Sequence, residues 1–166
     1  MTKMMVAMLL VLSACSPGVS APPISAVDQV CSDDFCIDVP DGWEAEIGDS
    51  YVSLHHTSDP ENTFLTAGII DMEAIVTSSG GTWPVPTEDV VVSFWSLIEA
   101  ADVGSFTRSQ RMVGGAVRSW GDHETGKMWH LVYPLDGSSA IGIELRAPNG
   151  SWETHADVVF ESVTQR

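Results

Sequence analysis

The sequence predicts an α+β fold in which an antiparallel β-sheet of about seven strands is covered by two amphipathic helices. Short segments with alternating apolar and polar residues follow one another along most of the chain, and glycine-containing turn signals separate them. Two longer segments, at 87–101 and near the C-terminus, instead place apolar residues at helical spacing. Two such helices need a sheet to cover, and this combination gives a layered sandwich.

The first residues are predicted to contain a targeting signal. Residues 4–12 are apolar, and nine residues are too few to span a membrane, which takes about 20. A short apolar run behind one cation has the proportions of a signal peptide. The next residues, Leu12-Ser13-Ala14-Cys15, resemble the lipobox of bacterial lipoproteins.

We therefore expect a lipoprotein signal peptide at 1–14 and an acylated Cys15 that attaches the chain to a bacterial membrane from the extracytoplasmic side. Residues 15–26 would then be the lipidated cysteine and a flexible tether, rich in Ser, Pro and Ala. An uncleaved N-terminus with an incidental cysteine is the alternative. Residues 27–166, about 140 in number, have the usual size of one globular domain.

Charge is distributed unevenly along the chain, which has a net charge of −16. Residues 15–107 contain sixteen Asp and Glu and no Lys or Arg, whereas residues 108–166 contain seven acids and six bases. Nucleic acid is therefore not an expected partner, because its binding needs a basic footprint. An anionic membrane would repel the domain, so the lipid must attach it. The acidity either keeps an exported protein soluble or forms a face for a basic partner or divalent cations.

The first half of the domain is predicted to be mostly strands. Residues 27–32 and 35–40 form a hairpin, and the following Pro40-Asp41-Gly42 has the residue types of a turn. Further strands are predicted at 43–47, 51–56 and 64–72, and a loop at 77–86.

The second half begins with the predicted helix at 87–101, with Thr87 as its N-cap. A meander follows, with strands near 105–112, 115–122, 127–134 and 139–146. The last helix is capped by Asn149 or Ser151, and its apolar stripe consists of Trp152, Ala156, Val159, Phe160 and Val163.

Two cysteines remain once lipidation has used the first. Cys31 and Cys36 flank the turn of the predicted hairpin, which would set them close together across the two strands. In an exported protein this even pair predicts a disulfide. Two reduced, buried thiols are the alternative, and a metal site fits less well because no histidine accompanies them.

Residues 35–43, FCIDVPDGW, together with the order of elements, resemble the PsbP-like superfamily of α/β/α sandwiches. That superfamily includes LpqN-type lipoproteins, which suits the lipobox. The resemblance implies a non-catalytic binding or assembly module. It implies no particular functional residue, because partner sites differ among the members.

Histidines are the main candidates for chemistry. His55 and His56 are adjacent in a predicted strand, so they point to opposite faces and cannot easily share a metal. His123 and His130 lie on neighbouring predicted strands, where an approach across the hairpin would create a ligand pair. His155 reads as a half-buried helix histidine.

One aromatic stands out as a binding residue. Trp83 lies in the predicted loop at 77–86, and exposed tryptophans often anchor interfaces. The alternative is a side chain that folds back onto the sandwich.

The sequence therefore predicts a lipid-anchored, extracytoplasmic binding or assembly-support protein without catalysis and without a cofactor. Its partner would be a protein or a small ligand. A histidine-dependent metal-binding enzyme or hydrolase is the alternative.

Overall fold

The computed structural model describes residues 27–166. The signal peptide, Cys15 and the tether predicted above lie outside these residues. In chain order the elements are β1 (Val27–Cys31), β2 (Phe35–Pro40), β3 (Trp43–Ile47), β4 (Tyr51–His56), β5 (Phe64–Asp71), α1 (Met72–Ser78), α2 (Thr87–Ala100), β6 (Gly104–Arg111), η1 (Val113–Gly115), β7 (Val117–His123), β8 (Gly126–Pro134), β9 (Ser139–Ala147), η2 (Gly150–Trp152), α3 (Glu153–Ser162) and β10 (Thr164–Gln165).

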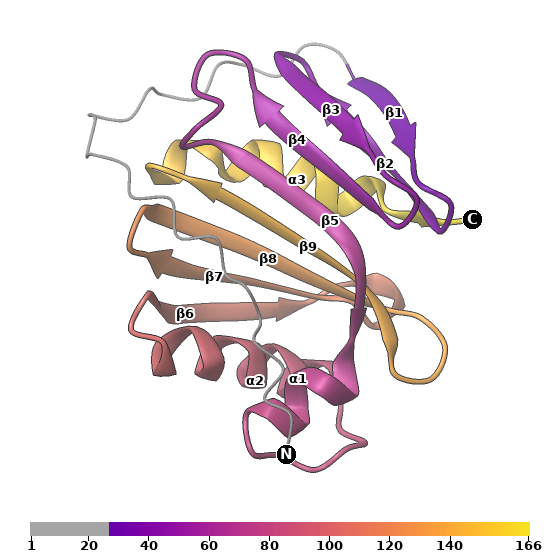
Figure 1. The fold of residues 1–166 in the computed structure, drawn as a ribbon, viewed down its shortest axis with the longest axis vertical. Helices are drawn as coiled ribbons and strands as arrows, with labels where there is room; N and C mark the ends of the chain where they lie inside the picture. Colours follow the sequence, from indigo (N-terminus) through magenta and orange to yellow (C-terminus); the bar gives the residue numbers. More distant parts are fainter. Residues whose placement is uncertain (1–26) are drawn as a thin grey trace.

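The centre of the molecule is a seven-stranded antiparallel sheet with the strand order β3-β4-β5-β9-β8-β7-β6 (Figure 1). The predicted α+β fold class is therefore confirmed. The predicted hairpin also forms, but it does not join this sheet. Together with β10 it makes a second, three-stranded sheet with the order β1-β2-β10.

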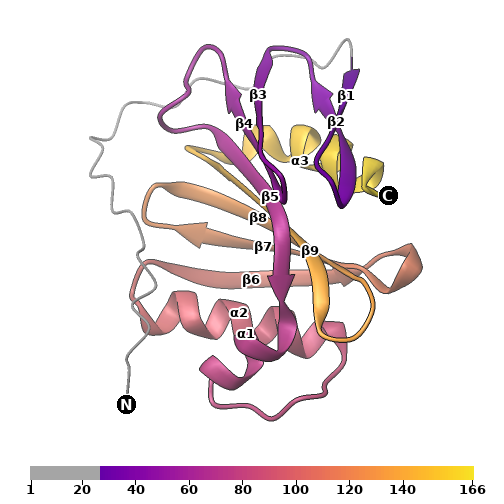
Figure 2. The ribbon, with the colours of Figure 1, turned by 45° about the vertical axis from the view of Figure 1, so that its right-hand side comes forward.

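One face of the large sheet is covered by α3 and by the three-stranded sheet (Figures 1 and 2). We call it the covered face. Alternate residues of each strand point into it, and Leu54, Leu131 and Ile143 are fully buried there against Ile37 of β2. The predicted stripe of the last helix packs here too, since each of its five members is buried. Burying one such side chain contributes about 1.5–3 kcal/mol relative to leaving it exposed.

The opposite face is covered only in part. Helix α2 packs over β6, β7 and β8, α1 packs against α2, and the apolar side chains of both helices belong to a second core cluster. Trp95 is the centre of this contact, since its indole Nε1 donates a hydrogen bond to Ser119 Oγ at 2.8 Å. Gly121 of β7 makes room for the ring, because a Cβ there would lie 2.2 Å from a Trp95 carbon. Trp95 and Gly121 thus form a close contact between α2 and β7.

The N-cap prediction for α2 is wrong by one residue. Pro86 is the N-cap, with φ −59° and ψ 154°, and Thr87 is the first residue of the helix. The N-cap makes no side-chain hydrogen bond to the first turn. The Pro86 carbonyl oxygen accepts bonds from the amides of Asp89 and Val90. Proline fixes φ near this value, so the extended segment ends at the proline and the helix starts directly after it.

Helix α1 was not predicted, because residues 64–72 read as a strand and residues 77–86 as a loop. It is only seven residues long and follows β5 directly. Asp71 caps it by accepting bonds from the amides of Glu73 and Ala74. Met72 and Val76, one turn apart, are both buried. An aspartate at the end of a strand pattern was the available signal.

The last helix is preceded by a short 3-10 turn. Asn149, one of the two predicted caps, accepts a bond from the amide of Ser151 at 3.0 Å, and α3 itself begins at Glu153. His155 was expected to be half-buried. It is instead fully buried, because it lies on the same side of the helix as Trp152 and Val159.

Candidate functional site

The half of the sheet that α2 leaves uncovered is the candidate site. The strand register aligns its outward side chains in rows that cross β3, β4, β5 and β9. We call this surface the open half-face. Its rows are Glu44, His55, Phe64 and Arg146; then Glu46, Ser53, Thr66 and Glu144; then Tyr51, Gly68 and Gly142.

Within residues 27–166, several side chains of this surface are exposed to solvent. Thr66 is exposed although it lies in the middle of β5, an interior strand. Glu44 and Glu46 on the outer strand are exposed as well. Figures 1 and 2 show α2 along β6, α1 next to α2 at the end of β5, and α3 on the covered face, so that no described helix lies over the open half-face.

Two aromatic side chains give the open half-face apolar contact area. Tyr51 is 45% exposed, and its ring lies against Gly48. Its hydroxyl donates to Glu46 Oε1 at 3.2 Å, and the charge of that carboxylate raises the tyrosine pKa. Phe64 is half-buried between the His55 ring, 6.3 Å away between centroids, and the Arg146 guanidinium, 5.9 Å from its centroid. Aromatic residues that retain exposure are typical contact residues of interfaces.

The charges of the open half-face are mainly negative. Arg146 Nε lies 2.5 Å from Glu144 Oε1, and both side chains are about one-fifth exposed. Within residues 27–166, Glu44 and Glu46 form no ion pair. The surface therefore has one internally neutralised pair and two uncompensated carboxylates.

Helix α2 borders the open half-face. Its Phe94 stacks on His130 of β8, with the ring centroids 3.9 Å apart and the planes 14° from parallel. His130 is 4% exposed and lies opposite Glu144 in the register of β8 and β9. Burial lowers the pKa of His130 to about 3, so the ring is neutral at pH 7. Neutral and covered, His130 supports the border between α2 and the sheet.

The histidines do not assemble into a metal site in the described part of the chain. His55 lies on the open half-face and His56 on the covered face, as predicted. His123 and His130 lie on the same face of the sheet but not opposite each other. In the strand register His130 lies opposite Ser119, and the His123 ring Nδ1 is hydrogen-bonded to Thr125 Oγ1 at 2.9 Å. No group of three or more His, Cys, Asp or Glu in residues 27–166 is arranged to hold a metal ion.

His56 and His155 instead belong to a buried aromatic cluster with Trp43 and Trp152. Trp43 Nε1 donates to His155 Nδ1 at 2.9 Å, and the His56 and Trp152 ring centroids are 4.7 Å apart. Desolvation and the nearby His155 lower the pKa of His56, although Asp59 acts in the opposite direction. This cluster joins β3 and β4 to α3, and its role is structural.

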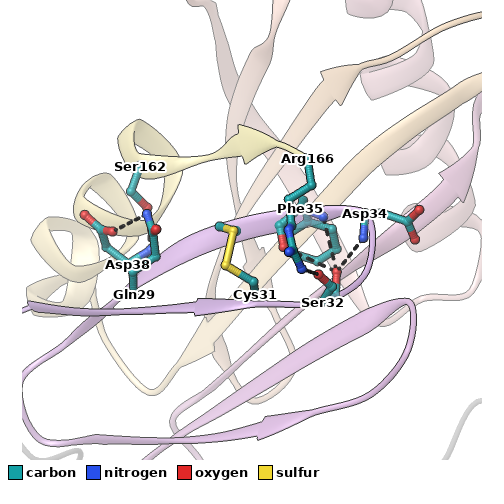
Figure 3. Close-up of a disulfide and its surroundings, with 9 residues drawn as sticks. Gln29, Cys31, Ser32, Asp34, Phe35, Asp38, Ser162 and Arg166 are labelled. Atoms are coloured by element: carbon teal, nitrogen blue, oxygen red, sulfur yellow. Dashed lines mark hydrogen bonds between the residues drawn. A yellow bond between two sulfur atoms is a disulfide. The ribbon is translucent and has the colours of Figure 1, made fainter.

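The other predicted site residues lie away from the open half-face. Trp83 is half-buried and packs against the cluster formed by α1 and α2. Cys31 and Cys36 lie opposite each other in the hairpin, with their sulfur atoms 2.03 Å apart, at disulfide distance (Figure 3). Beside them, the amide of Asp38 donates to Ser162 Oγ at 2.8 Å and so connects the hairpin to α3.

None of the helices within residues 27–166 is both long and apolar enough to cross a bilayer.

Comparison with known proteins shows the fold. The solution structure of cyanobacterial PsbP (CyanoP) from Synechocystis sp. PCC 6803 superposes with a TM-score of 0.56 at 15% sequence identity, covering 93% of this chain and 99% of that chain. The chain thus has a PsbP-like fold. A structure from Bacteroides thetaiotaomicron VPI-5482 superposes less well, with a TM-score of 0.40 at 12% identity, covering 80% of this chain and 45% of that chain. No protein-family model and no curated protein matches the sequence.

Proposed function

We propose that this protein is a non-catalytic binding module, attached to a bacterial membrane outside the cytoplasm through a lipid on Cys15, and that it binds a partner protein with the open half-face. The observation that carries the proposal is the open half-face itself. Two of its four strands, β4 and β5, present Tyr51, Thr66 and the half-buried Phe64 on a face whose other half is covered by α2.

The construction of this face supports binding. Interior strands give a rigid floor, because β4, β5 and β9 are hydrogen-bonded to neighbours on both sides. The aromatic side chains of β4 and β5 therefore project from a rigid backbone, which limits the entropy lost on association. The alternative predicted from the sequence is a histidine-dependent metal-binding enzyme or hydrolase, and residues 27–166 contain no group of three or more His, Cys, Asp or Glu arranged to hold a metal ion.

The lipid attachment in this proposal is inferred from the sequence alone. Leu12-Ser13-Ala14-Cys15 would supply the modification site, and LpqN-type lipoproteins are members of the PsbP-like superfamily that residues 35–43 resemble. The acidic domain would be repelled by anionic lipids, so an acyl anchor explains how it stays at the membrane.

Site-specific photo-crosslinking in intact cells tests the binding surface. A photoreactive phenylalanine at Ser53, in the middle of the open half-face, should yield a discrete crosslinked product. Thr66→Arg in the same chain should abolish the product, because Thr66 is the neighbour of Ser53 in the row. Thr154→Arg on α3 is the matched control, since Thr154 is also an exposed threonine, and it should leave the product unchanged. No product, or equal loss in both variants, would overturn the proposal.

A further inference from the structure

We propose that the partner presents an amphipathic helix with Lys or Arg beside its apolar positions, and that this helix lies on the open half-face next to α2. This inference rests on the proposed function and names the partner class of the same surface. It depends on the width of the surface, on its hydrogen bonding and on its charge.

The width of the open half-face fits one helix. The surface extends from β3 to β9, which are separated by three strand spacings. Three spacings amount to about 14 Å, and a helix with its side chains is about 10–12 Å across. On the same face, α2 already covers the other strands through Trp95. A second helix beside α2 would complete the layer.

Hydrogen bonding favours a helix over an extended segment. The backbone groups of β4, β5 and β9 are used in ladders to both neighbours, so the face offers side chains only. An extended segment on this face would find no partners for its own amides and carbonyls. A helix satisfies these groups internally and contributes side chains alone.

Charge makes the expected helix basic. Glu44 and Glu46 form no ion pair in residues 27–166, and the five described Lys and Arg residues other than Arg166 are each paired with a different carboxylate. Arg166 donates to the carbonyl oxygen of Ser32 in the β1–β2 turn. The chain therefore has no described cation left to neutralise the two glutamates, and a Lys or Arg of the partner would do so. The rings of Tyr51 and Phe64 would contact its apolar stripe.

The test uses two synthetic peptides of about 14 residues, about 21 Å long as helices. They share a leucine and alanine stripe, and they carry either lysine or glutamate on the flanks. Binding to the full chain in a nonionic detergent is measured by fluorescence anisotropy, with protein-free micelles as the blank. We expect the lysine peptide to bind and the glutamate peptide not to bind.

Matched charge variants separate a site from general attraction to an acidic protein. E44Q/E46Q should raise the Kd of the lysine peptide about three- to tenfold, the size expected for two exposed ion pairs. E124Q/E161Q removes two charges from exposed glutamates outside the open half-face and should leave the Kd within about twofold.

Two outcomes would overturn the inference. One is an equal loss of affinity in both double variants. The other is equal binding of the glutamate peptide. Either result leaves the crosslinking at Ser53 unaffected, so failure of this inference differs from failure of the proposed function.

Discussion

Acidification should destabilise the protein through His130, because the fold buries this ring and the desolvation disfavours its protonated form. The unfolded ring has an ordinary pKa near 6.5, whereas burial in the fold lowers the pKa to about 3. Below about pH 6.5 the unfolded chain therefore binds a proton that the folded chain does not bind, and stability falls as the pH falls. The loss continues down to about pH 3, where the folded ring also becomes protonated.

The magnitude follows from the two pKa values. Between about pH 8 and about pH 5 the contribution of His130 amounts to about 2 kcal/mol of lost unfolding free energy. It approaches about 5 kcal/mol near pH 3, at about 1.4 kcal/mol for each pKa unit. The ring is stacked under Phe94 and 4% exposed, so solvent screening does not reduce the effect strongly.

Urea unfolding followed by tryptophan fluorescence measures this effect at each pH. The reference is His130→Met, which places an apolar side chain under Phe94 that cannot titrate. The wild type should lose about 2 kcal/mol more than this variant between about pH 8 and about pH 5. His130→Gln serves as a second reference in case methionine packs poorly. Parallel pH profiles for the wild type and both variants would refute the reasoning.

Four further predictions follow from other features. Cys15→Ala should leave the precursor uncleaved and unlabelled by a fatty-acid probe, and labelling that persists would contradict lipidation. Mass spectrometry of the exported protein without reduction should show Cys31 and Cys36 joined, whereas two alkylatable thiols would contradict it. Gly121→Ala should cost at least about 1–3 kcal/mol in urea unfolding, since its Cβ would overlap the indole in α2, while Gly150→Ala faces open space and should cost little. The thermal midpoint should rise with sodium chloride from low to moderate concentration, because salt screens the repulsion among the carboxylates; a flat or falling midpoint would show that this repulsion is unimportant.

Local signals were sufficient for most of the secondary structure. The turn at 40–42 and the glycine-containing turns of the meander define where the chain reverses, so the strands and the hairpin were predictable. Helix α1 was missed because seven residues are too few for a convincing helical period. The burial of His155 was predictable from its spacing, since it lies three residues after Trp152 and four before Val159.

The open half-face was not predictable from local patterns. Alternation in β4 and β5 separates the two faces of each strand, but it does not say which part of a face a helix covers. That depends on long-range packing, such as the contact of the Trp95 ring with Gly121 between α2 and β7. Tyr51 and Phe64 were therefore read only as members of strands.

Both ends of the described domain lie in the small sheet, and their position determines where a fused protein or tag is attached. Val27 begins β1 and Gln165 ends β10, and both strands pair with β2 in the small sheet on the covered face. Figure 2 shows the C-terminus beside β1 and β2. A fluorescent protein, an affinity tag or a sensor chip joined at either end is thus located behind the large sheet. The open half-face then points away from the point of attachment and stays accessible to whatever approaches from the front.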